Sequence, residues 1–255
     1  MNAPRPRPAV ALRRYAATQA SEVHDFHQIV LGVEGSMDMA VDGREARIDR
    51  SGAWIIPAGA RHDYWAAGDN RQLVLDLPFA SLAVPERFFD QARCITLHPS
   101  ITRLVAGFAQ GAGGAQSSEC HRFAWHAAAH LCGALMHDAG HAVFPSQGLD
   151  FARIDAWLRR HLAEPLRIAD LAAHCGFGMR RFHQLFNDAF GETPHRYLQR
   201  LRLDTALTRL ADPHAALMDI ALDCGFADQS AFTHAFTKRF GMAPGQWRAG
   251  GIRTH

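Results

Sequence analysis

Ile-Ala-Asp-Leu-Ala-Ala-His-Cys-Gly-Phe at residues 168–177 and Met-Asp-Ile-Ala-Leu-Asp-Cys-Gly-Phe at residues 218–226 are two copies of one pattern. Each copy continues with three phenylalanines spaced by four, a proline and a further aromatic residue: Phe182, Phe186, Phe190, Pro194 and Tyr197, then Phe232, Phe236, Phe240, Pro244 and Trp247. The copies lie 49 residues apart up to Gly-Phe (177 to 226) and 50 apart afterwards (182 to 232). One supersecondary unit is therefore used twice, with one extra residue in the second turn.

The composition is that of an ordinary globular protein large enough for two domains. The chain has 255 residues, of which 48% are hydrophobic and 20% charged, which excludes the fibrous and low-complexity classes. No apolar run reaches the ~18 residues of a membrane span. The five cysteines are isolated, which favours a reducing compartment and predicts a cytoplasmic protein. Because Cys175 and Cys224 occupy the same place in the two copies, we expect both to be small buried hydrophobic residues.

The first half of the chain alternates in short runs with turn punctuation. We expect strands at residues 28–33, 36–41, 44–48, 52–57 and 71–77, and the Asp42-Gly43 pair predicts a type I′ hairpin turn between two of them. Many short strands at this spacing are typical of an antiparallel barrel or jelly roll. Residues 1–20, which begin with alternating proline and arginine, are expected to form a disordered arm.

The period changes to that of helices further along the chain. Apolar stripes predict helices within residues 99–138, which either cover the barrel or meet a second chain. Residues 141–148 are the best candidate for a linker between a first domain at 21–140 and a helical domain at 149–250. Residues 149–255 hold 14 Lys and Arg against 11 Asp and Glu, a net charge of +3, and the remainder carries −1. This mild asymmetry does not by itself indicate nucleic-acid binding.

The spacing of residues in each repeated unit is typical of a helix-turn-helix. A short helix, a glycine-marked turn and a second helix with aromatic residues at i and i+4 would fix the second helix to a core and leave its other face free for a DNA major groove. A polar face on an amphipathic helix is also compatible with simple solvation, but two copies joined by one long helix favour DNA recognition. The free faces carry side chains that hydrogen-bond bases or phosphates: Arg180, Arg181, His183 and Gln184, then Gln229, Ser230, Thr233, His234 and Lys238.

Residues 149–250 resemble the DNA-binding domain of the AraC/XylS family of transcription regulators. The resemblance rests on both Cys-Gly-Phe turns, on Asp-Leu-Ala and Asp-Ile-Ala before them, and on Phe-Gly-Glu-Thr-Pro and Phe-Gly-Met-Ala-Pro after them. It implies a homodimer that binds double-stranded promoter DNA and works with RNA polymerase. By position, the family's base-contacting places fall on Arg180, His183 and Gln184, and on Gln229, Ser230, Thr233 and His234.

Two positions depart from the family pattern. Gly178 stands where the family usually has a serine N-cap, and glycine is a slightly poorer cap. His234 stands where arginine is common, so a contact there would depend on pH. Arg180 remains suited to guanine, and Gln184 or Gln229 to adenine.

Residues 22–66 resemble the cupin fold. By position, the set that binds metal in metal-holding cupins falls on Glu22, His24, Gln28 and His62. Three interpretations stay open: an effector pocket at a barrel mouth, a divalent metal site, or a structural role inside a degenerate barrel. Two of the four depart from the usual ligands and glutamine is a poor one, so we expect no cofactor and favour the effector pocket. His27, one residue from Gln28, should point to the opposite face as a surface or edge histidine.

The sequence thus predicts an α+β protein of two domains. A cupin-like antiparallel β-barrel with helices would bind a small-molecule effector and dimerise through the helix at residues 119–138. An all-α domain with two helix-turn-helix motifs joined by a long helix would bind DNA. The alternative is a metal-dependent cupin enzyme carrying a DNA-binding domain.

Overall fold

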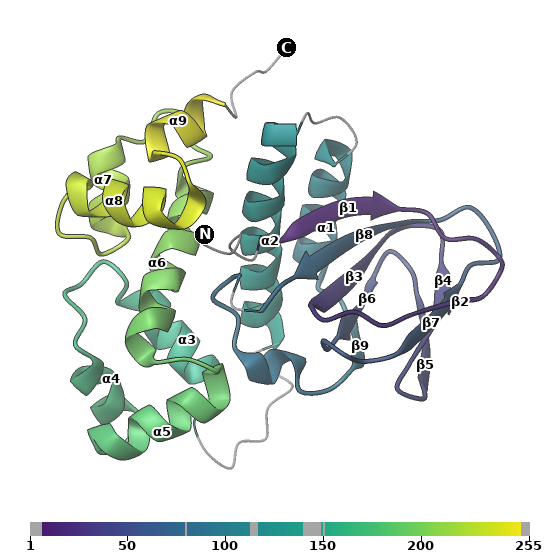
Figure 1. Ribbon diagram of the computed structural model, residues 1–255, viewed down its shortest axis with the longest axis horizontal. Coiled ribbons are helices and arrows are strands. Elements are labelled where there is room, and N and C mark those ends of the chain that lie inside the picture. Colours follow the sequence, from purple (N-terminus) through teal and green to yellow (C-terminus); the bar gives the residue numbers. More distant parts are fainter. Residues whose placement is uncertain (1–6, 80, 113–116, 140–148, 150, 251–255) are drawn as a thin grey trace, which may run out of the picture. The chain divides into compact units, whose positions relative to one another are not determined.

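The computed structural model describes residues 7–79, 81–112, 117–139, 149 and 151–250 (Figure 1). The chain divides into two compact units. The N-terminal unit comprises Met1–Leu82 and Glu86–Leu135, and the C-terminal unit comprises Met136–His255 together with the short segment Ala83–Pro85. The expected α+β architecture of a β-sheet part followed by a helical part is confirmed. The linker expected at residues 141–148 lies outside the described residues.

Two antiparallel sheets form the core of the N-terminal unit. The five-stranded sheet has the order β1-β8-β3-β6-β9 and the four-stranded sheet the order β2-β7-β4-β5. The strand bounds are β1 Ala9–Arg13, β2 Ala20–Glu22, β3 His27–Glu34, β4 Met37–Val41, β5 Arg44–Ile48, β6 Gly52–Ile56, β7 His62–Trp65, β8 Arg71–Leu77 and β9 Arg93–Thr96.

Alternation along the strands explains how the two sheets meet. Val30 on β3, Trp54 on β6 and Val74 on β8 are buried in one cluster with Met37 and Met39 of β4. Because side chains alternate between the faces of a strand, one face of each sheet contributes to this shared interior. The Asp42-Gly43 turn between β4 and β5 has φ angles of 47° and 78°, as the predicted type I′ turn requires.

The expectation of a disordered arm over residues 1–20 is wrong for Ala9–Arg13. These residues form β1, which pairs antiparallel with β8 from Ala9 opposite Asp76 to Arg13 opposite Gln72. Four of its five residues are partly buried. The edge of β8 supplies the backbone partners, and the proline-arginine composition of the residues before it concealed a strand that only tertiary pairing creates.

Two helices complete the N-terminal unit. After the 3₁₀ turn η1 (Glu86–Phe89), α1 (Pro99–Gly111) packs on β3, and α2 (Ser117–Ala139) runs beside α1 (Figure 1). His98 caps α1, and a proline occupies its first turn, where the missing N–H costs nothing. In the described part of the chain, no helix combines the length and the apolarity that crossing a membrane would require.

Two histidines of α2 lie against Phe108 of α1. The ring centroids of His126 and Phe108 are 5.6 Å apart, and those of His126 and His130 are 4.9 Å apart. Among the described residues, His126 Nε2 and His130 Nδ1 are buried without a hydrogen-bond partner. Burial, reinforced by the neighbouring His130, lowers the pKa of His126 to about 4.

We predict that this pair makes folding stability depend on pH. A histidine whose pKa is depressed in the folded state stabilises fully above its unfolded pKa of about 6.5, and that stability is lost as pH falls toward 4. His126 should contribute at most about 3 kcal/mol of this dependence. Urea unfolding between pH 7 and pH 4 should therefore show a flatter profile for His126→Phe than for the wild type. The control His195→Gln, at an exposed position of α6, should keep the wild-type slope; an equal slope in both variants would contradict the assignment.

The C-terminal unit is helical, as predicted, and contains the repeat. Its helices are α3 Phe151–Arg160, α4 Ile168–His174, α5 Met179–Phe190, α6 Pro194–Arg209, α7 Leu217–Asp223, α8 Gln229–Phe240 and α9 Pro244–Ala249. The pairs α4–α5 and α7–α8 are the two helix-turn-helix copies, and α6 is the long helix that joins them (Figure 1). Cys224 is fully buried as expected, whereas Cys175 is only half-buried, although both are C-cap residues of the first helix in their copy.

The two turn glycines share a conformation but differ in their surroundings. Gly176 and Gly225 have φ angles of 76° and 77°, a region that only glycine enters readily. A Cβ at Gly225 would lie 2.0 Å from the Leu162 carbonyl oxygen and 2.8 Å from Arg202 Nε, whereas a Cβ at Gly176 would meet nothing within 4 Å. Gly225 is therefore required both by its backbone conformation and by its close neighbours, whereas Gly176 is required by its backbone conformation alone.

This difference gives a matched pair of substitutions. Gly176→Ala should cost about 1–2 kcal/mol, the penalty for a left-handed backbone at a residue with a Cβ. Gly225→Ala should cost about 1–3 kcal/mol more, because the backbone of Leu162 must also move. Urea unfolding of the full chain measures both costs. Equal losses would show that the close approach at Gly225 relaxes freely.

Candidate nucleic-acid interface and inner polar site

Aromatic packing fixes the orientation of α5. Phe182, Phe186 and Phe190 are buried along one face of the helix. The Phe186 and Phe190 rings are stacked with centroids 3.9 Å apart, and Tyr197 of α6 meets Phe190 edge-on at 4.8 Å. Stacked and edge-on contacts of this kind stabilise beyond the area they bury. The opposite face of α5 is therefore held toward solvent.

The same arrangement recurs in the second copy. Phe232, Phe236 and Phe240 are buried along α8, and Trp247 of α9 meets Phe236 nearly edge-on with centroids 5.6 Å apart. Trp247 thus stands where Tyr197 stands in the first copy. The repeat identified in the sequence is a repeat of this packing.

Both helices end alike and begin differently. Gly191 and Gly241 occupy the left-handed position after α5 and α8, the common glycine-ended C-cap. At the start of α8, Asp228 Oδ1 accepts a hydrogen bond of 2.7 Å from the Ala231 N–H. Gly178 is the N-cap of α5 and has no side chain with which to make such a bond, as the sequence indicated. The start of α8 is therefore better secured.

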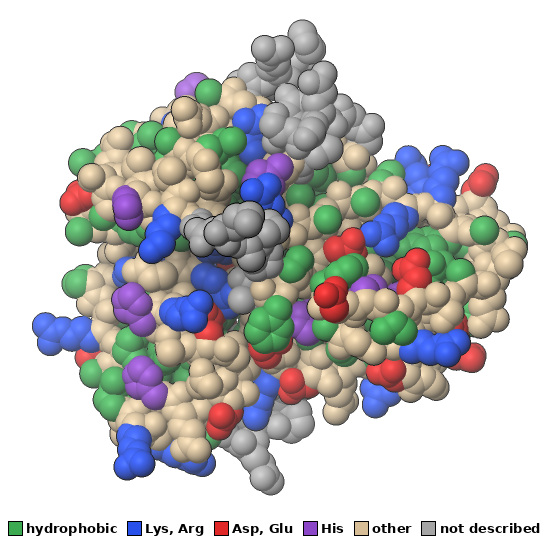
Figure 2. Space-filling view, in the orientation of Figure 1, with side chains coloured by type: hydrophobic (Ala, Val, Ile, Leu, Met, Phe, Trp, Pro, Cys, Tyr) green, Lys and Arg blue, Asp and Glu red, His purple; other side chains and the backbone are tan. Residues whose placement is uncertain are grey.

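The structure places the predicted DNA-binding residues on the free faces of α5 and α8. In α8, Thr233 is half-buried, and Arg181 Nη1 on α5 donates to Gln184 Oε1 at 3.2 Å. Lys, Arg and His side chains are spread over the visible face of the helical unit (Figure 2). The exposed residues of the set are Arg180, Arg181, His183, Gln184, Gln229, Ser230, His234 and Lys238.

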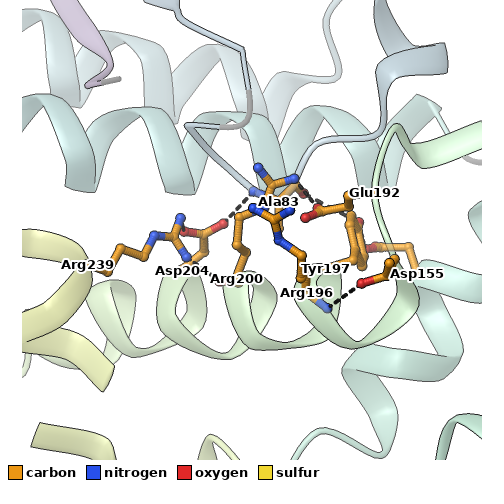
Figure 3. Close-up of polar contacts among 9 residues, drawn as sticks. Ala83, Asp155, Glu192, Arg196, Tyr197, Arg200, Asp204 and Arg239 are labelled. Carbon is orange, nitrogen blue, oxygen red and sulfur yellow. Dashed lines mark hydrogen bonds and ion pairs between the residues drawn. The ribbon is translucent and has the colours of Figure 1, made fainter. Parts of the chain in front are cut away.

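Buried ion pairs hold α6 to its neighbours (Figure 3). Asp204 of α6 pairs with Arg239 of α8, and Arg239 Nη1 also donates to the Arg200 carbonyl oxygen at 2.8 Å. Burial raises the pKa of Asp204, although Arg239 opposes the shift. Burial likewise raises the pKa of Glu192, which pairs with Arg200. Charges withdrawn from water in this way need partners in fixed positions. The Asp204–Arg239 pair therefore helps to set where α8 lies on α6, and the Glu192–Arg200 pair fixes the turn before α6.

In the N-terminal unit, three of the four predicted effector residues come together at β2 and β7. His62 Nε2 lies 3.9 Å from Glu22 Oε2, and the rings of His24 and His62 have centroids 5.0 Å apart. Tyr64, two residues along β7, donates to Glu22 Oε1 at 2.7 Å. Burial and this bond to Glu22 raise the pKa of Tyr64 to about 12, so its hydroxyl stays a donor at neutral pH.

Both imidazoles direct an acceptor nitrogen inward. His24 Nδ1 lies 2.7 Å from the Phe26 carbonyl oxygen and His62 Nδ1 lies 3.3 Å from that of Ala60, so in the neutral rings Nδ1 donates and Nε2 accepts. Burial lowers the pKa of His62 and keeps it neutral. In the described part of the chain, neither Nε2 atom has a hydrogen-bond partner.

Gln28 belongs to a different polar group. Its amide donates to Asp76 Oδ1 at 2.8 Å, and Arg13 of β1 donates to Asp76 Oδ2 at 2.6 Å. Among the described residues, no hydrogen bond or ion pair links Gln28 to the other three predicted residues. Sequence reasoning missed Arg13 and Asp76. The available signal was a carboxylate within the otherwise apolar strand at residues 71–77.

The expectation of a surface or edge role for His27 is wrong. His27 does point away from Gln28, but it is buried: its ring stacks on Phe89 at 4.0 Å. Its Nδ1 accepts from the Ala58 N–H at 3.0 Å, and its Nε2 lies 3.1 Å from Glu86 Oε2. η1 covers this face of the sheet, which the strand pattern could not show.

The described residues of the predicted set do not have the arrangement of metal ligands. Across the residues that the structure describes, no group of three or more His, Cys, Asp or Glu side chains is arranged to hold a metal ion. The sequence set of Glu22, His24, Gln28 and His62 is split between two polar groups. The geometry offers hydrogen-bond acceptors instead.

Comparisons with known proteins agree with the two-unit architecture. A family model described as an AraC-binding-like domain matches residues 8–143, and one described as a helix-turn-helix domain matches residues 171–250. The chain is 25% identical over 228 residues to the probable transcriptional regulator LumQ of Photobacterium leiognathi, covering 88% of this chain and 90% of that protein.

Two further similarities are of the same kind. An uncharacterized HTH-type transcriptional regulator, YobQ of Bacillus subtilis strain 168, is 25% identical over 236 residues, which are 92% of this chain and 91% of that one. Among solved structures, the DNA-binding domain of the global transcriptional factor AdpA, in complex with a target DNA, matches with a TM-score of 0.37 and 28% identity over 39% of this chain and 89% of that one. Both of these relatives, which match over most of their length, are named as transcriptional regulators.

Proposed function

Because this chain belongs to the AraC family of transcription regulators, we propose that it binds promoter DNA in response to a small molecule and reads the bases with α5 and α8. The observation that carries the proposal is the contrast between the two copies. Their buried aromatic residues are alike, whereas their exposed faces carry different side chains. Two helices that read different half-sites need a shared scaffold and different surfaces, and a purely structural repeat has no such need.

The proposed contacts follow from side-chain chemistry. Arg180 can donate two hydrogen bonds to guanine, and Gln184 or Gln229 can pair with adenine in both directions. Arg181, Lys238 and Ser230 are suited to phosphates, which fix the register of the protein on the duplex. His183, Thr233 and His234 complete the set. A homodimer formed through the helix at residues 119–138, contact with RNA polymerase and a cytoplasmic location belong to the same proposal.

Two substitutions test the placement of the recognition helices. Arg180→Ala and Gln229→Ala should each weaken binding to a specific duplex by about 1–3 kcal/mol, roughly 5- to 150-fold, because a base contact is lost. The duplex is obtained by selecting bound sequences from a random library, and fluorescence anisotropy at fixed salt measures its affinity.

The control is Arg103→Ala, which removes an exposed charge from α1 in the other unit. Arg103→Ala should bind the selected duplex like the wild type, and all three variants should keep the wild-type circular dichroism spectrum. If folded Arg180→Ala and Gln229→Ala retained full specific affinity, the bases would be read elsewhere.

We infer that the effector binds where His24, His62 and Glu22 meet. Two buried imidazole nitrogens without hydrogen-bond partners among the described residues and the adjacent carboxylate of Glu22 form an acceptor-rich site, which is costly to leave unsatisfied. The Gln28–Asp76–Arg13 group lies on neighbouring strands of the other sheet and forms the second polar element of the proposed pocket.

A thermal-shift screen of small metabolites against the full chain tests this inference. A compound that raises the melting temperature of the wild type at saturating concentration should fail to do so with His62→Leu, because an acceptor is removed. The variant His195→Gln should respond like the wild type. A compound that stabilises His62→Leu equally would bind outside this site.

A further inference from the structure

A short piece of the first half of the chain belongs to the C-terminal unit. Ala83–Pro85, here called the strap, groups with residues 136–255, whereas Leu82 and Glu86 on either side of it group with the N-terminal unit. Leu82, Ala83 and Val84 are all buried. The chain therefore passes between the units at both ends of the strap as well as between Leu135 and Met136.

The strap is held by hydrogen bonds from its backbone (Figure 3). The Ala83 N–H donates to Asp204 Oδ2 at 2.7 Å, and the Tyr197 hydroxyl lies 3.4 Å from the Ala83 carbonyl oxygen. Asp204 holds Arg239 with its other oxygen. One buried carboxylate thus binds the strap and the recognition helix α8 at the same time.

The chain on either side of the strap leads to β8 and to a contact with β3, the two strands that carry Asp76 and Gln28. Upstream, the strap follows β8, whose Asp76 accepts the hydrogen bond of Gln28 on β3. Downstream, Glu86 lies 3.1 Å from Nε2 of His27, the neighbour of Gln28 on β3. Glu86 directly follows Pro85, so the link from the strap to His27 of β3 is short, whereas residues 78–82 separate the strap from the end of β8. A displacement of β3 would therefore act on the strap more directly than a displacement of β8.

We propose that the strap couples the N-terminal unit to α8 through its docking on Asp204, so that a change in the inner polar groups alters the seating of a recognition helix. The coupling rests on the proposed function, because it gives the effector its route to the DNA. Such coupling requires a structural element whose conformational equilibrium is shifted by both the effector site and the DNA site.

Hydrogen exchange of the full chain tests the docking. In Asp204→Ala the Ala83 amide loses its acceptor, so a peptide covering residues 81–88 should exchange at least about tenfold faster than in the wild type. The control is Asp223→Ala: Asp223 of α7 also pairs with an arginine of α6, Arg209, and among the described residues no hydrogen bond or ion pair links it to the strap or to Asp204. That control should leave the exchange of this peptide unchanged.

A second variant acts from the side of the strap and leaves α6 intact. Val84→Asp places a charge at a buried position and should expel the strap, with the same fast exchange at residues 81–88. It serves as the test of docking if Asp204→Ala fails to fold. Wild-type exchange at this peptide in a folded Asp204→Ala or Val84→Asp would overturn the proposal.

The coupling itself is measured by pulse-labelling with deuterium at increasing urea, which gives each unit its own unfolding curve. In the wild type the two midpoints should coincide, and in Val84→Asp they should separate. The same spacing of midpoints in both proteins would show that the strap transmits nothing and would overturn the proposal.

DNA gives the second readout of coupling. Affinity for the selected duplex should change at least about fivefold in Val84→Asp, although every proposed base contact remains; unchanged affinity would overturn the role in seating α8. If the full chain selected no duplex at all, the proposed function would fail, while the exchange and unfolding results would still decide whether the strap is docked and coupled.

Discussion

The buried carboxylate of Asp204 is the constraint on which the C-terminal unit depends. Burial disfavours its charge and raises its pKa, and the compensation comes from Arg239 on α8 and the Ala83 N–H. Removing one partner of such a buried pair costs about 3–5 kcal/mol, because the remaining charge stays buried. One side chain of α6 thus binds both α8, through Arg239, and the backbone of Ala83.

The two helix-turn-helix copies share the same buried aromatic residues but differ in the contacts that fix their turns and second helices. The second copy has a carboxylate cap at Asp228, a turn glycine pressed against Leu162, and an ion pair from α8 to α6. The first copy has an uncapped start at Gly178 and an open turn at Gly176. Among the described residues, α8 therefore has fixed contacts at its start, at its turn and along its length that have no counterpart at the start and the turn of α5.

Local signals were sufficient where short-range chemistry decides the structure. Asp42-Gly43 gave its hairpin, the strand at Arg71–Leu77 was placed correctly, and the phenylalanines fixed the phase of α5 and α8, so the exposed residues followed. Prediction failed where partners are distant in sequence. β1 exists because β8 offers an edge 63 residues away, as in the Arg13–Asp76 pair, and the Ala83–Asp204 bond spans 121 residues. Neither partner has a local pattern that reveals the other.

The alternation of side chains along β3 explains why Gln28 does not join Glu22, His24 and His62, and why His27 is buried on the other face. Adjacent residues of a strand point to opposite faces, so Gln28 reaches Asp76 between the sheets and His27 reaches Glu86 on the outside. A single peptide unit of β3 therefore joins the inner polar group to the residue that follows the strap. Because the sheet is hydrogen-bonded on both sides of β3, this unit cannot rotate independently. In the proposed coupling, β3 would connect the interior of the sheets to the chain segment bound at Asp204.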